Sequence, residues 1–209
     1  MRIVETPVYD FTELSAAARD KARAWFRETI HDDWCDSVYD DFERICPILG
    51  VTLATTPVHL MGGGTRQKLC IWFSGFWSQG DGACFEGRYA YAPRASRRIR
   101  DYAPQDTELH RIADALQALQ RPNFYQLTAS FRQTGRHYGM TVDVDRDGPA
   151  CQAIAGRTGD DLVEVLRDLA NWLYRALERE YEFQTSDETV DEGISANDYT
   201  FTAEGRRFG

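Results

Sequence analysis

Hydrophobic residues recur every three or four positions in several stretches of the chain, and this spacing predicts amphipathic helices. The longest stretch, residues 159–182, carries one continuous apolar stripe made of Leu162, Val165, Leu166, Leu169, Trp172, Leu173, Ala176 and Leu177. Shorter stretches with the same period predict helices at about 16–30, 33–45, 107–121 and 186–197. Ser15 is the expected N-cap of the first helix. Pro47 lacks a backbone donor, so the second helix should end or bend near Ile45.

Elsewhere apolar and polar residues alternate, which predicts strands. The predicted strands are 2–9, 51–54, 68–76, 83–92, 125–133, 136–145 and a short tail at 199–201. Short turns join them, including Gly62-Gly63-Gly64 and Thr134-Gly135, while the helices gather toward both ends of the chain. This order predicts an α+β fold with an antiparallel sheet of about five to six strands and helices packed on one face. No linker or repeat interrupts the chain, so a single domain over residues 1–209 is expected.

Composition narrows the class of protein. Hydrophobic residues make up 43% and charged residues 27%, as in ordinary globular domains. No apolar run approaches the ~20 residues that cross a bilayer, and no signal peptide is recognisable, which predicts a cytoplasmic protein without a membrane partner. The five cysteines include no CxxC pair, which favours reduced thiols. A net charge of −9 makes nucleic acid an unlikely general partner.

The segment between two predicted strands, Ser74–Gly82, is richer than a hairpin turn requires. Asp81-Gly82 alone could make such a turn. Aromatic and hydrogen-bonding side chains on a glycine-rich loop are typical of ligand and partner sites. The candidate binding residues are Ser74, Phe76, Trp77, Ser78, Gln79 and Asp81. In the alternative interpretation Trp77 caps the core and Asp81 only sets the turn.

Two charged clusters are further candidates. An acidic face on the second helix, formed by Asp33, Asp36, Asp40 and Asp41, could attract a basic partner, although most such faces are simply solvated. A basic patch over Arg94–Arg100, formed by Arg94, Arg97, Arg98 and Arg100, could touch phosphate or make local ion pairs.

No familiar catalytic, metal or cofactor motif is present. None of the four histidines stands at metal-ligand spacing with another: His31, His59, His110 and His137. If the fold brought His137 next to Cys84 or Ser74, the histidine would act as a general base for that nucleophile. The run Asp143-x-Asp145-x-Asp147-Gly148 resembles the front of a calcium loop, but its twelfth position, where Glu is needed, is Ile154. We therefore predict no catalytic residue, no metal and no cofactor.

The decapeptide from Ser74 to Ala83, SGFWSQGDGA, resembles the signature of a family of uncharacterised proteins from tailed phages and prophages. Residues 9–15 and 197–202 are similar to the family as well, while Cys84 stands where Ser is expected. The family is sometimes labelled an antitoxin of a toxin–antitoxin stability system. The resemblance implies a phage-borne accessory protein in the cytoplasm of an infected or lysogenic bacterium.

These observations together predict a non-enzymatic protein that binds and modulates a host bacterial protein or complex. Inhibition of a defence system, of the anti-CRISPR or anti-restriction type, is one form of that activity. An alternative is a small-ligand-binding protein or an enzyme that uses the Ser74–Gly82 loop. A second alternative is a nucleic-acid contact through Arg94–Arg100.

Overall fold

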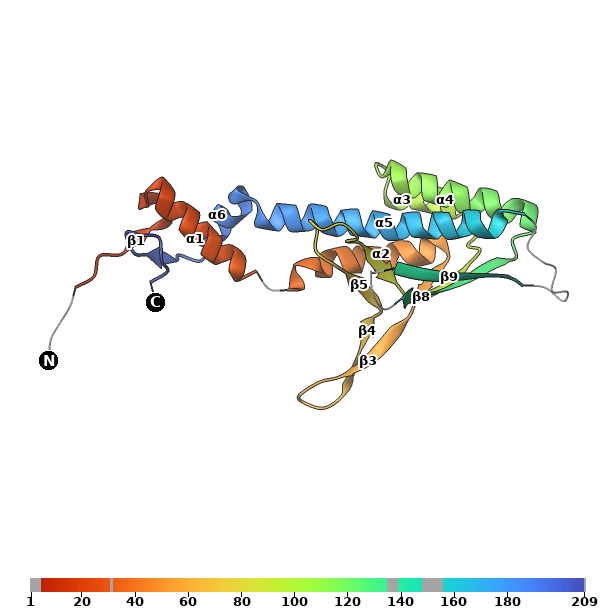
Figure 1. The fold of residues 1–209 in the computed structure, drawn as a ribbon, viewed down its shortest axis with the longest axis horizontal. Helices are drawn as coiled ribbons and strands as arrows, with labels where there is room; N and C mark the ends of the chain where they lie inside the picture. Colours follow the sequence, from red (N-terminus) through yellow and green to blue (C-terminus); the bar gives the residue numbers. More distant parts are fainter. Residues whose placement is uncertain (1–4, 31, 135–138, 148–155, 209) are drawn as a thin grey trace. The chain divides into compact units, whose positions relative to one another are not determined.

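A computed structural model describes residues 5–30, 32–134, 139–147 and 156–208 of the chain (Figure 1). Within these residues helices and antiparallel strands occur together, which confirms the predicted α+β class. The chain divides into two compact units. The terminal unit comprises Met1–Ser37 and Leu177–Gly209, and the central unit comprises Val38–Ala176.

The terminal unit joins the two ends of the sequence. Its elements are β1 (Tyr9–Asp10), η1 (Phe11–Glu13), α1 (Ala16–Glu28), η2 (Asp32–Cys35), the end of α5 (Thr158–Thr185), α6 (Asp187–Ala196) and β10 (Thr200–Phe201). Strand β1 pairs antiparallel with β10. The hydroxyl of Ser15 accepts a hydrogen bond from the Ala18 N–H at 3.3 Å, which confirms the predicted cap of α1. Of the predicted strand 2–9, only Tyr9 lies in β1, and residues 1–4 are outside the described part.

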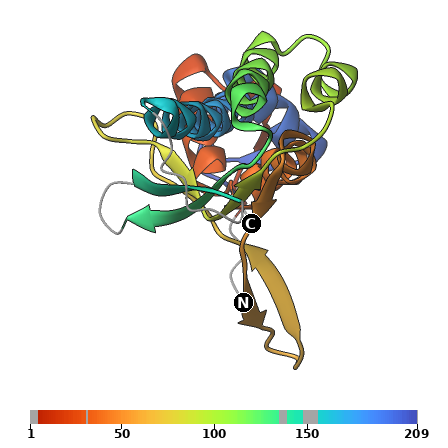
Figure 2. The ribbon, with the colours of Figure 1, turned by 90° about the vertical axis from the view of Figure 1, so that its right-hand side faces the viewer.

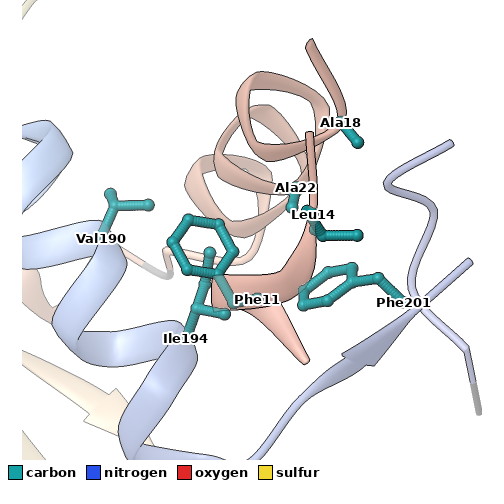
Figure 3. Packing of buried hydrophobic residues seen from close by; sticks show 7 residues of the cluster. All are labelled: Phe11, Leu14, Ala18, Ala22, Val190, Ile194 and Phe201. Carbon is teal, nitrogen blue, oxygen red and sulfur yellow. The ribbon is translucent and has the colours of Figure 1, made fainter. Parts of the chain in front are cut away.

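A small hydrophobic cluster stabilises this unit (Figure 3). The buried members come from η1, the turn after it, α1, α6 and β10: Phe11, Leu14, Ala18, Ala22, Val190, Ile194 and Phe201. The rings of Phe11 and Phe201 meet edge to face with centroids 6.3 Å apart. Beside the cluster, the Arg23 guanidinium donates to both carboxylate oxygens of Asp191 at 2.7 Å. The cluster therefore depends on residues from opposite ends of the sequence.

The central unit contains the largest sheet, in the antiparallel order β2-β7-β8-β9. Its strands are β2 (Val51–Leu53), β7 (Gly87–Ala90), β8 (Leu127–Thr134) and β9 (Gly139–Arg146). Burial alternates along β8, where Leu127, Ala129 and Phe131 are buried. Helices α4 (Thr107–Gln120) and α5 lie over the same face of the sheet (Figure 2). Helices on one face are as predicted, but this sheet has four strands instead of five to six.

The remaining strands leave the sheet at a three-way junction. The Ala54 N–H donates to the Glu86 carbonyl at 2.8 Å, the Cys70 N–H donates to the Ala54 carbonyl at 2.9 Å, and the Glu86 N–H donates to the Cys70 carbonyl at 2.9 Å. These bonds close a ring, and at each of the three residues the chain changes its strand partner. Because the strand partners change at this junction, each of the predicted strands 68–76 and 83–92 is divided between two shorter strands, and the main sheet has fewer strands than predicted.

Two hairpins project from the junction. The first, here called the β3–β4 arm, consists of β3 (Thr55–His59) and β4 (Thr65–Leu69). The second, the β5–β6 arm, consists of β5 (Ile71–Phe73) and β6 (Ala83–Phe85), and the Ser74–Gly82 loop forms its tip.

Two helices differ from the sequence predictions. Helix α2 (Asp36–Leu49) continues through Pro47, so the predicted end near Ile45 is wrong. Pro47 lies in the last turn and removes the single bond that its N–H would make to the carbonyl four residues earlier, and the buried side chains of Ile48 and Leu49 stabilise the continuation. Helix α3 (Ala95–Tyr102) was not predicted, because its apolar face is only Ala95 and Ile99 between arginines. Among the described residues, no helix combines the length and apolar character needed to cross a membrane.

Candidate functional site

The Ser74–Gly82 loop is fastened at its base by backbone and side-chain bonds between its two ends. The Ser74 N–H donates to the Gly82 carbonyl at 3.0 Å. In return, the Gly82 N–H donates to the Ser74 hydroxyl at 2.9 Å. Ser74 thereby closes the loop with its backbone and its side chain, which gives this candidate residue a positioning role.

The tip of the loop is a tight turn held by Asp81. The Asp81 carboxylate accepts a hydrogen bond from the Ser78 N–H at 2.7 Å, and the Asp81 N–H donates to the Ser78 carbonyl at 3.1 Å. Gly80 lies between them with φ +96°, a conformation that residues with a Cβ rarely adopt. Asp81 therefore sets the turn, as the alternative interpretation of this residue expected.

Aromatic rings connect the loop to helix α5. Phe73 stacks on Phe76 with centroids 5.9 Å apart, and Phe76 meets Tyr174 of α5 at 5.5 Å. The Tyr174 hydroxyl also donates to the Gly75 carbonyl at 3.1 Å. Trp77 packs edge to face against Phe76 with centroids 6.2 Å apart. The ring of Trp77 therefore rests on an aromatic support that the body of the central unit provides.

The exposure of the loop separates the two interpretations of Trp77. This residue is 79% exposed, so it does not cap the core. Ser78 and Gln79 beside it are exposed as well, while Phe76 is partly buried. Tryptophan is highly buried on average in folded proteins, so a largely exposed ring on a fastened loop suits a contact surface.

The residues of the predicted acidic face differ in their contacts. Asp33, Asp36 and Asp40 are exposed, and within the described part of the chain none of them forms an ion pair. Asp41 instead accepts a hydrogen bond from the Tyr102 hydroxyl at the end of α3. This bond and burial raise the pKa of Tyr102 above its ordinary value. Asp41 thus joins α2 to α3. Asp40, in contrast, is an exposed carboxylate of the central unit that forms no ion pair with any described residue.

The basic patch lies on α3 and is partly neutralised. Arg100 donates to both carboxylate oxygens of Asp114 at 2.6 and 3.1 Å, and Arg97 lies 3.8 Å from Asp101. These two contacts are the local ion pairs that one interpretation of the patch expected. Arg94 and Arg98 are exposed and make no ion pair with any described residue.

The groups considered for chemistry do not assemble into a reactive centre in the described residues. Cys35, Cys46, Cys70 and Cys84 are all buried. Burial raises the pKa of the Cys84 thiol to about 11, which disfavours the nucleophilic thiolate at neutral pH. No group of three or more potential metal ligands occurs within the described ranges.

The suggested calcium loop is only partly described. Asp143 and Asp145 belong to β9, where they pair with Ser130 and Thr128, so they are strand residues. Asp147 follows β9, and its N–H donates to the Gln126 carbonyl at 2.9 Å. Several positions that carried predictions of a metal ligand, a base, a turn or a thiol lie outside the described residues: His31, Gly135, His137, Gly148, Cys151 and Ile154.

One concave feature was not predicted from the sequence. A shallow hollow of about 390 Å³ lies on the open face of the main sheet, beside the strand junction. Its polar lining includes Glu86, Arg88, Ser130 and Arg132. These residues come from strands that are distant in sequence, and no local motif marks them.

The fold and the site together define an α+β protein whose central unit presents a fastened, outward-facing aromatic loop. The chain belongs to the family described as "Domain of unknown function (DUF8835)", which matches residues 34–187. The matched region includes the junction and both arms. No curated protein and no solved structure matches the chain.

Proposed function

We propose that this protein is a phage-borne accessory protein that binds a host bacterial protein through the Ser74–Gly82 loop. The observation that carries the proposal is the 79% exposure of Trp77 on a loop whose backbone is held at both its base and its tip. The phage origin rests on the resemblance of the SGFWSQGDGA segment. Inhibition of a bacterial defence complex is the form of activity that such an origin favours.

Physical chemistry explains why such a loop suits binding. Association costs free energy when flexible side chains and loops must be ordered, so a contact that is already ordered binds more tightly. Tryptophan is also among the residues that contribute most to interfaces, because its large ring buries much apolar surface. Ser78 and Gln79 next to it supply donors and acceptors for the polar rim of a contact.

The experiment is a pull-down of tagged protein from bacterial lysate, followed by measurement of affinity for the captured partner. Trp77→Ala combined with Gln79→Ala should weaken binding by at least ~2 kcal/mol, while the melting temperature stays near that of the wild type. Phe183→Ala is the matched control, since Phe183 is 59% exposed and lies outside the loop. Full capture by the double variant would contradict the proposal, as would an equal loss in the control.

The hollow on the open sheet face supports a second candidate, a small-ligand-binding protein. Its volume of about 390 Å³ falls in the range of ligand sites, and Arg88 and Arg132 favour an anionic ligand. Native mass spectrometry of the purified protein would show a bound small molecule that Arg88→Ala removes. A partner protein that is captured without any such molecule would favour the loop proposal instead.

A further inference from the structure

The β3–β4 arm extends away from the body of the central unit in both views (Figures 1 and 2). Its two five-residue strands give it a length of about 17 Å at ~3.4 Å per residue. Every residue from 55 to 68 is exposed, including Leu60 at 51% and Met61 at 109% near the tip. A two-stranded hairpin is marginally stable alone in water, so a contact with a partner would stabilise it.

The arm is positively charged in a negatively charged chain. No Asp or Glu occurs from residue 44 to residue 80, although the net charge of the chain is −9. In the register of the arm, Arg66 lies opposite Val58 and Lys68 lies opposite Thr56, which places both cations on one face. Neither cation forms an ion pair with any residue that the structure describes. The arm therefore presents an unpaired cationic face and an apolar tip.

The edges of the arm are poorly suited to pairing with another strand. Pro57 in β3 has no N–H to donate, and charged side chains on β4 discourage addition of a further strand. A partner should therefore contact the cationic face and the tip of the arm.

The number of cations argues for a protein partner over a nucleic acid. Proteins that bind duplex DNA through its phosphates commonly make about 6–10 such contacts, and this arm offers only Arg66 and Lys68. Exposed Leu60, Met61 and Val58 beside an arginine are instead typical of a protein interface, in which Met and Arg are enriched. The complementary surface would be acidic, with an apolar spot beside its carboxylates.

The central unit itself carries a surface of this kind on helix α2. Asp40, Glu43 and Pro47 are exposed and follow one another at helical spacing, so they share one side of the helix. Neither carboxylate forms an ion pair in the described part of the chain. Exposed Arg44 lies four residues after Asp40, so this surface carries two acids, one cation and an apolar residue, and its two acids and Pro47 match the two cations and the apolar tip of the arm.

We propose that the β3–β4 arm of one copy docks on this α2 surface of a second copy, and that the exchange is reciprocal. A twofold arrangement makes each copy both donor and acceptor of an arm. A standard interface takes about 20–30 residues from each side, and one arm together with its acceptor surface approaches that number. The inference does not depend on the proposed function, because the Ser74–Gly82 loop takes no part in it.

The test is sedimentation velocity of the full chain and of two charge-reversal variants. The arm variant carries Arg66→Glu and Lys68→Glu, and the helix variant carries Asp40→Lys and Glu43→Lys. The wild type should form a dimer, and each variant alone should dimerise at least about tenfold more weakly because like charges then face one another. An equimolar mixture of the two variants should restore the dimer, since both contacts again join opposite charges.

Arg98→Glu with Arg121→Glu is the matched control for the arm variant. Both arginines are exposed in the same unit, and the net charge of the chain changes by the same amount as in the arm variant. This control should remain dimeric. If the helix variant fails to fold, Asp40→Asn with Glu43→Gln replaces it and should also weaken the dimer. A monomeric wild type would overturn the proposal, as would a mixture that stays monomeric. Binding of a labelled DNA duplex by a monomer through Arg66 and Lys68 would overturn it in favour of nucleic acid.

Discussion

The indole N–H of Trp172 donates a hydrogen bond to the carboxylate of Asp106 at 2.8 Å. The other carboxylate oxygen of Asp106 accepts from the Leu109 N–H at 2.9 Å and so caps α4. One aspartate thereby connects the start of α4 to the middle of α5. Trp172 is 7% exposed, and its ring stacks on Phe42 with centroids 6.2 Å apart.

Trp172→Ala should destabilise the protein by about 3–5 kcal/mol, because it removes a buried ring and leaves a cavity. Trp172→Phe keeps most of the apolar contact and loses the bond to Asp106, so we expect a smaller cost of about 1–2 kcal/mol. Denaturant unfolding followed by circular dichroism measures both. Equal costs for the two variants would show that packing on Phe42 contributes little.

Gln120 is a fully buried polar residue whose amide replaces a missing strand partner. Its Nε2 donates to the Leu127 carbonyl at 2.7 Å and to the Tyr89 hydroxyl at 3.2 Å, and its Oε1 accepts from the Leu127 N–H at 3.1 Å. Gln120→Leu should cost about 2–4 kcal/mol, since the volume is kept but Leu127 loses both bonds. Gln117→Leu, on the exposed side of α4, loses only the exposed bond that the Ser96 hydroxyl donates at 3.1 Å, and should cost under about 1 kcal/mol in the same unfolding assay.

Stability should fall at alkaline pH. Burial raises the pKa of Cys84 from 9.0 to about 11 and the pKa of Tyr89 from 10.0 to about 12. The folded state therefore keeps protons that the unfolded state releases, so this contribution is complete below pH 9 and is lost between pH 9 and pH 12.

Unfolding titrations across that range would measure the decline. Burial also raises the pKa of Cys46, so Cys84→Ala should make the first part of the decline less steep without removing it, and Tyr89→Phe should do the same for the later part. A stability profile that stays level up to pH 12 would contradict the protonated, buried state of both groups.

Gly205 allows a close approach within the terminal unit. Its φ is +79°, and a Cβ at this position would lie 2.0 Å from the carbonyl oxygen of Ala18. Gly205→Ala should therefore loosen the contact between the C-terminal tail and α1 at a cost of about 1–3 kcal/mol. Hydrogen exchange of α1 amides would report it. Gly62→Ala is the control, since a Cβ at residue 62 would have no neighbouring atom within 4 Å and exchange should not change.

Local sequence patterns determined the main helices and the place of the loop. The apolar stripe of residues 159–182 became α5, and Ser15 caps the helix that follows it. The composition of Ser74–Gly82 was sufficient to select the loop as a candidate site. The predictions of the helices and of the loop's position succeed because helix periodicity, capping and glycine-rich turns depend on neighbours within a few residues.

Contacts between segments that are distant in sequence decided how the strands pair and how the loop is supported. The partner exchange at Ala54, Cys70 and Glu86 depends on three strands meeting, and no single strand encodes it. Tyr174 supports the loop from a position 99 residues away from Gly75, and this contact holds the loop from which Trp77 points outward. The sequence by itself therefore determined most of the helices and the position of the candidate loop. Only packing between distant segments decided which strands pair, which aromatic ring stays exposed and which polar groups are satisfied inside.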